Sequence, residues 1–162
     1  MKSIITFIGI LSFVAVQSQD SETDTFRICN EEKMYAVDFY ILMDSLGDDF
    51  KDPRHLPDFN GKHYYLKNHF KGFSLKNTSA EDNIVRLYLA FIVNCEGKAG
   101  NFFIIGDRKP EFKDVEERVL NIARTMPQKW LPAEHRRNKV DCYQVIHITI
   151  FNGQFTNLFW EE

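Results

Sequence analysis

The sequence has no excess of positive charge and no nucleotide-binding glycine motif. Its 162 residues carry a formal net charge of −3, so the chain lacks the basic stripe through which proteins approach DNA or RNA. No Walker or Rossmann glycine pattern occurs. These absences argue against nucleic acid as a partner and against a nucleotide cofactor.

The chain also lacks histidine and cysteine pairs at the spacing of metal or catalytic sites. His55, His63 and His69 are spread along one segment, whereas zinc ligands usually lie about two to five residues apart. Cys142 and His147 fall on opposite faces of one expected strand, which keeps a nucleophile away from its base. We therefore expect no metal, no cofactor and no catalytic residue, and we interpret the protein as a non-enzyme.

The first residues of the chain form a processing signal. Lys2 precedes an apolar run over residues 4–16, which is shorter than the roughly 20 residues of a spanning helix. Val16 and Ser18 suit the positions that flank a cleavage site. We expect a signal peptide over residues 1–18, cleaved after Ser18, and export to the periplasm; the alternative is a leader retained as a membrane anchor.

Residues 19–56 form an expected N-terminal extension. Tyr35, Val37, Phe39, Ile41 and Met43 alternate with other residues, and this alternation predicts a strand over residues 34–43. A short helix is expected after residue 57, with an apolar face and with a glycine, at position 72, as its end.

The second half of the chain predicts a strand, a hairpin, a second strand, a helix and a third strand. Residues 84–94 have one apolar face, a turn around Gly97 follows, and residues 102–105 form the partner strand. An apolar stripe from Val115 to Met126 predicts a helix that Pro127 ends.

The final strand alternates β-branched residues around position 148. An Asn152-Gly153 pair then predicts a hairpin, with residues 154–160 returning as a strand or packing as a surface tail.

Elements with one apolar face bury it by stacking helix on sheet. We therefore expect an α+β fold: a two-layer sandwich in which a small antiparallel sheet packs on one main helix. A strand and a short helix extend it on the N-terminal side. Trp130, with its large apolar ring, is expected to fill the gap between the helix end and the sheet.

Residues 115–151 resemble the C-terminal domain of TonB and its relatives in Gram-negative bacteria. A helix leads to the motif P-Q-K-W-L-P-A at residues 127–133, then to a polar turn ending in Lys139-Val140 and to a strand. The pattern F-x-V-N-x-x-G-K at residues 91–98 and a P-x-F-x-G opening at residue 57 extend the resemblance to residues 57–162. Asn138 and His147 depart from the family, which usually has glycine and proline there.

The resemblance implies an exported, non-catalytic domain that binds a protein or peptide by strand addition, in which backbone hydrogen bonds supply affinity. Such a domain acts in periplasmic or outer-membrane transport, with an outer-membrane transporter or another envelope protein as partner. Both a monomer and a strand-exchanged homodimer are open. The implied docking edge is a single stretch of strand, which the returning strand after Gly153 would cover: Tyr143, Gln144, Val145, Ile146, His147, Ile148 and Thr149.

Three cysteines allow at most one intramolecular disulfide. The family arrangement pairs the last strand with the first hairpin strand, which brings Cys95 near Cys142 on the helix side. A Cys95–Cys142 bridge then forms if the Cα atoms lie within about 7 Å; two buried free thiols are the alternative.

Two other functions stay open. A TonB-type energy transducer would keep its leader as an anchor, although the chain has no proline-rich linker. A small secreted enzyme or ligand carrier would use a pocket in the aromatic-rich N-terminal half. Arg136, Arg137 and Lys139 form a small basic turn, which is either solvated or matched to an acidic partner.

Overall fold

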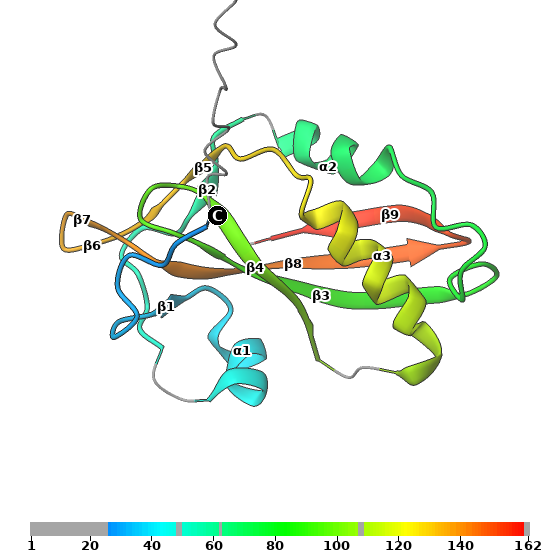
Figure 1. Ribbon diagram of the computed structural model, residues 1–162, viewed down its shortest axis with the longest axis horizontal. Helices are drawn as coiled ribbons and strands as arrows, with labels where there is room; N and C mark the ends of the chain where they lie inside the picture. Colours follow the sequence, from blue (N-terminus) through cyan, green and yellow to red (C-terminus); the bar gives the residue numbers. More distant parts are fainter. Residues whose placement is uncertain (1–25, 48–49, 62, 107–108, 161–162) are drawn as a thin grey trace, which may run out of the picture.

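The computed structural model describes residues 26–47, 50–61, 63–106 and 109–160 (Figure 1). The expected signal peptide and its cleavage site lie outside these residues. The elements follow in this order: β1 (Tyr35–Ala36), α1 (Phe39–Leu46), β2 (Asp58–Phe59), α2 (His63–Lys71), β3 (Ile84–Val93), β4 (Ala99–Ile105), η1 (Pro110–Phe112), α3 (Lys113–Ala123), β5 (Trp130–Leu131), β6 (Ala133–His135), β7 (Asn138–Val140), β8 (Cys142–Phe151) and β9 (Gln154–Phe159). The α+β class is confirmed.

The main sheet is built on the antiparallel pair β3 and β8. Their register runs from Ile84 opposite Phe151 to Val93 opposite Cys142. β4 pairs with the outer side of β3, while β9 and β1 share the other side of β8. β1 runs parallel to β8, so the sheet is mixed rather than antiparallel as expected. Two small pairs, β2–β5 and β6–β7, complete the strands.

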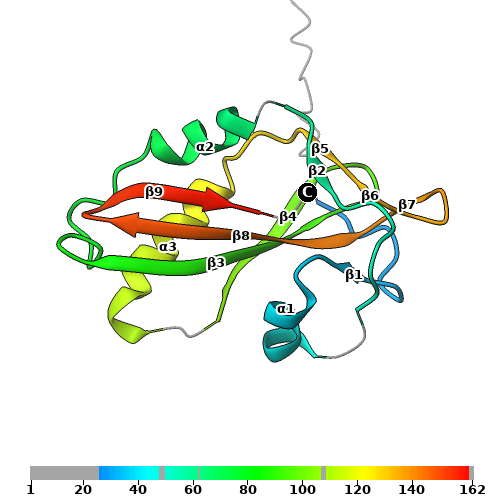
Figure 2. The same ribbon diagram turned by 180° about the vertical axis from the view of Figure 1, so that it is seen from behind.

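The helices lie on both faces of the sheet. α2 and α3 cover one face, where Leu66, Phe70, Val115 and Val119 enter the main core. α1 covers part of the other face, where Leu42 packs in a smaller cluster (Figure 2). The expectation of two layers is therefore incomplete. The physical reason is that β3 alternates between exposed and buried only in its first half and is buried on both faces in its second half.

The strand expected over residues 34–43 is wrong beyond its first residues. Asp38 adopts a left-handed backbone conformation with φ of 61°, which ends the extended chain after β1. The following residues form α1, because Leu42 can then bury its side chain completely against Ala90 and Val145. Tertiary packing on the second sheet face overrides the local alternation.

Several other expectations are confirmed. α2 ends at Lys71, and the N–H of Gly72 donates to the Asn68 carbonyl. β9 returns along β8 after a turn in which Asn152 and Gly153 both have positive φ, as a two-residue hairpin loop requires. Trp130 is 4% exposed and packs edge-on against Phe59 and Phe91. Within the described ranges, no helix is long and apolar enough to cross a membrane.

Candidate functional site

The docking edge expected on β8 is occupied, so that prediction is wrong. At its start, Tyr143 pairs with β1 and its carbonyl accepts the N–H of Val37 at 3.0 Å. Towards its end, His147, Ile148 and Thr149 pair with β9. Between them, the N–H of Val145 donates to the Gln144 side-chain oxygen at 2.9 Å. β8 is thus an interior strand that offers no free edge to a partner.

The side chains of the expected edge hold the fold together. Val145, Ile146 and Ile148 are buried in the two cores. His147 hydrogen-bonds the Asp38 carboxylate at 2.7 Å, with its ring edge-on to Tyr88. This contact fixes the residue at which the chain turns from β1 into α1.

The disulfide joins Cys95 to Cys29, with 6.1 Å between the Cα atoms. The expected Cys95–Cys142 bridge is therefore wrong, and Cys142 is a buried free thiol. Burial raises the pKa of that thiol far above its ordinary value. The alternation of side chains along β3 does not predict the direction of Cys95, because Cys95 lies in the turn beyond β3. The N-terminal segment crosses this turn. No local signal marks that long-range contact.

Two long strands of the main sheet pair on one side only: β9 pairs with β8 and is contacted by α2, and β4 pairs with β3. A register shift opposite Phe91 introduces a bulge, and Asn101 there has a φ of 52°. Phe102 and Phe103 are half-buried. The Phe102 ring lies 5.5 Å from that of Phe91, in the main core, whereas Phe103 faces the second cluster. β4 therefore presents one aromatic ring on each face of the sheet.

The first residues of β4 are covered by other parts of the chain. The N–H of Ala99, which points away from β3, donates to the Gln128 side-chain oxygen at 2.6 Å. At Gly100 the Phe26 ring packs so closely that any side chain would overlap it. These contacts leave residues 101–105 of the edge uncovered, of which Asn101 is exposed, Phe102 and Phe103 are half-buried, and Ile104 and Ile105 are buried.

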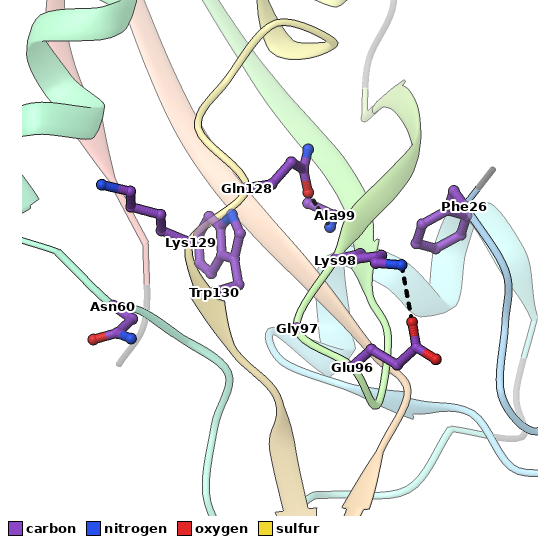
Figure 3. Close-up of a pocket in the computed structure, with 9 residues that line it drawn as sticks. All are labelled: Phe26, Asn60, Glu96, Gly97, Lys98, Ala99, Gln128, Lys129 and Trp130. Carbon is purple, nitrogen blue, oxygen red and sulfur yellow. Dashed lines mark hydrogen bonds and ion pairs between the residues drawn. The ribbon is translucent and has the colours of Figure 1, made fainter. Parts of the chain in front are cut away.

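A pocket of about 760 Å³ adjoins the covered start of β4 (Figure 3). Its lining residues come from the turn between β3 and β4, the chain after α3, the segment after β2 and the N-terminal segment: Phe26, Asn60, Glu96, Gly97, Lys98, Ala99, Gln128, Lys129 and Trp130. Gly97 has a φ of 81° and lies against the Trp130 carbonyl, so this position requires glycine.

The polar groups of this pocket suit recognition of an extended chain. Lys98 forms an ion pair with Glu96 at 3.1 Å on the turn (Figure 3). Lys129 and Asn60 line the other side of the Trp130 ring (Figure 3). Ammonium and amide groups donate hydrogen bonds to backbone carbonyls and carboxylates. The pocket and residues 101–105 of β4 together form what we term the β4 docking edge, which the sequence did not predict.

One cluster has the donor atoms of a metal site. The sulfurs of Cys29 and Cys95 and a carboxylate oxygen of Asp141 lie within 4.8 Å of one another. The two sulfurs are bonded to each other, and the carboxylate accepts three backbone N–H groups, from Cys29, Asn30 and Cys95. In this state the cluster fixes the N-terminal segment and we assign no metal to it.

The chain matches no protein-family model, no curated protein and no solved structure. Its resemblance to TonB C-terminal domains thus rests on the sequence motifs within residues 57–162 alone.

Proposed function

We propose that the protein is an exported, non-catalytic binding domain of the TonB C-terminal kind, which takes an extended segment of a partner protein onto the β4 docking edge. The partner is an envelope protein such as an outer-membrane transporter. The observation that carries the proposal is that β4 pairs on one side only. It also presents two half-buried phenylalanine rings, Phe102 and Phe103, one on each face of the sheet.

The physical basis is strand addition. An edge strand carries unpaired backbone N–H and C=O groups that pair with an added strand. Side chains of the added strand alternate between the two faces of the sheet. Phe102 on one face and Phe103 on the other supply apolar contacts for both sets. At the start of β4, Lys98 and Lys129 line the pocket into which the added segment would continue.

The disulfide supports export. Disulfides persist in oxidising compartments such as the periplasm and are rare in the cytosol. Cys29 and Cys95 form one here, and the sequence predicts a signal peptide ahead of it. The two observations are independent of each other, because one concerns the leader and the other the folded domain.

Site-specific photocrosslinking in the native cell tests the proposal. Benzoylphenylalanine replaces Phe103 on β4 in one variant and Phe159, a 54% exposed residue of β9, in the matched control. We expect irradiation to join an envelope protein to the Phe103 variant and not to the Phe159 variant. Adducts of equal yield at both positions, or at Phe159 alone, would contradict docking at β4. An adduct with the mass of two copies would show that the partner is a second copy of this chain and not an envelope protein.

A further inference from the structure

A second pocket, of about 790 Å³, is lined by both cysteines of the disulfide, Cys29 and Cys95. Its walls are the segment from Cys29 to Tyr35, residues 51–52 and the β6–β7 hairpin, which projects at the end of the molecule opposite the β8–β9 turn (Figure 1). Four basic side chains line it: Lys33, Lys51, Arg136 and Lys139.

Glu134 lies directly opposite Lys139 in the β6–β7 hairpin, but the basic side chains of the pocket form no ion pair with acidic residues in the part of the chain that the structure describes. None of the four basic side chains takes part in the ion pairs formed among the described residues. Asp52 is the one exposed acidic residue in the lining. Asp141 also lines the pocket, but it is 1% exposed and its carboxylate is occupied by three backbone N–H groups. Glu31 and Glu32 line a neighbouring hollow that shares Cys29 and Asn30 with the basic pocket.

The backbone of the hairpin is strained where it presents its arginines. Arg136 and Arg137 are the two loop residues between the paired His135 and Asn138, with φ of 51° and 68°. Asparagine and glycine adopt this left-handed conformation readily, whereas arginine does so at a cost in free energy. Strained backbone at a charged loop is a feature of ligand sites, and it is independent of the charge count.

His135 adds an unused polar atom to the same lining. Its Nδ1 is buried and has no hydrogen-bond partner among the residues that the structure describes. Its ring packs against Tyr35 at 5.1 Å, which fixes its position. Buried polar atoms are normally hydrogen-bonded, so this nitrogen leaves the polar lining of the pocket incompletely paired.

We propose that the basic pocket binds a phosphate-bearing ligand. A phosphate ester carries up to two negative charges and three acceptor oxygens, so it engages several cations at once, with arginine as a planar fork and lysine as a point charge. The pocket volume falls within the range of small-molecule sites. A soluble phosphate ester and a lipid headgroup share this chemistry. The site is distinct from the β4 docking edge and does not depend on the function proposed there.

Calorimetric titration of the oxidised protein with sodium pyrophosphate at low salt tests the free-phosphate source. Flotation with vesicles containing phosphatidic acid, against phosphatidylcholine vesicles, tests the lipid source. Lys51→Gln is the test variant, because the hydrogen bonds of Lys51 use its backbone and should survive the change. Its N–H donates to the Met34 carbonyl, and its carbonyl accepts the Ala36 N–H. We expect it to weaken binding about tenfold, the effect of one charge-assisted hydrogen bond.

The matched control is Lys76→Gln, which removes the same charge at an exposed position. Lys76 lies beside Gly153, which belongs to the β8–β9 turn. We expect it to change binding by less than about twofold, since Lys76 lines no part of the basic pocket and lies by the β8–β9 turn, at the other end of the molecule. Binding that Lys51→Gln weakens and Lys76→Gln spares, in either arm, supports the site, and the responding arm identifies the source. Equal loss in both variants, or no binding in either arm, overturns it.

Discussion

The Asp141 carboxylate accepts the backbone N–H of Cys95 at 3.0 Å, although 46 residues separate the two along the chain. Its other oxygen accepts the N–H groups of Cys29 and Asn30. One buried side chain therefore holds the backbones of both disulfide partners. This contact explains why Cys95 pairs with Cys29 and not with Cys142, which immediately follows Asp141.

Replacing Asp141 by asparagine should destabilise the protein. The amide keeps one acceptor oxygen and directs an NH2 group at backbone donors, so buried N–H groups lose their partner. We expect the free energy of unfolding to fall by about 2–4 kcal/mol, measured by urea denaturation. The control is Asp82→Asn, the same change at an exposed residue, which should stay within about 0.5 kcal/mol. Similar losses in both variants would show that Asp141 is not the anchor.

The cysteines should differ sharply in reactivity. Without reductant, the folded protein should not react with iodoacetamide at pH 8, because burial raises the pKa of the Cys142 thiol and the other two cysteines are joined. Denaturant alone should expose one thiol. Peptide mapping by mass spectrometry checks this, and a peptide linking Cys95 to Cys142 would contradict the structure.

Reduction of the disulfide should lower stability. The bridge closes a loop with a sequence separation of 66, for which the chain-entropy relation gives about 4 kcal/mol. Urea denaturation of the oxidised protein and of Cys29→Ser/Cys95→Ser measures the difference. Cys142→Ala, which leaves the bridge intact, serves as the comparison and should lose much less.

The Ser79–Asp114 contact should make stability depend on acid pH. Hydrogen bonds from the Ser79 hydroxyl and N–H hold the pKa of Asp114 below its ordinary value of 3.8. A lowered pKa contributes stability above pH 3.8 that is lost as the pH falls through the folded value. Ser79→Ala should therefore be less stable than the parent at pH 7, with a gap that narrows towards pH 2.

Carboxyl NMR titration of Asp114 provides the direct check on this contact. Its pKa should rise in Ser79→Ala and stay unchanged in Ser45→Ala, where an exposed serine of α1 is replaced. A pKa of Asp114 that does not move in Ser79→Ala would exclude the hydroxyl as the cause.

Relieving the strained hairpin should stabilise the fold. Arg136→Asn with Arg137→Gly places preferred residues at two positions of positive φ, and we expect a gain of about 1–2 kcal/mol. The control, Arg136→Gln with Arg137→Gln, removes the same charges and keeps the strain, so its stability should stay within about 0.5 kcal/mol of the parent. Thermal unfolding distinguishes them; an equal gain in both variants would attribute the effect to charge repulsion.

The sequence was sufficient to predict the elements whose apolar side chains recur at a regular spacing. The apolar alternation of β3, the helical stripe from Val115 to Met126 and the Asn152-Gly153 turn each predicted an element that the structure contains. The burial of Trp130 followed from its size and its place after α3. These features depend on neighbours in the chain, so local pattern is sufficient to find them.

The tertiary structure alone decided which segments meet. Residues 39–46 form a helix because the second face of the sheet offers Leu42 a buried site, and β8 lost its free edge because β1 and β9 both pair with it. Cys29 reaches Cys95 through a carboxylate at position 141. Each of these contacts joins residues far apart in the chain, and its free energy comes from burial and hydrogen bonds that no local period encodes. The β4 docking edge and the basic pocket arise in the same way, from segments that only the fold brings together.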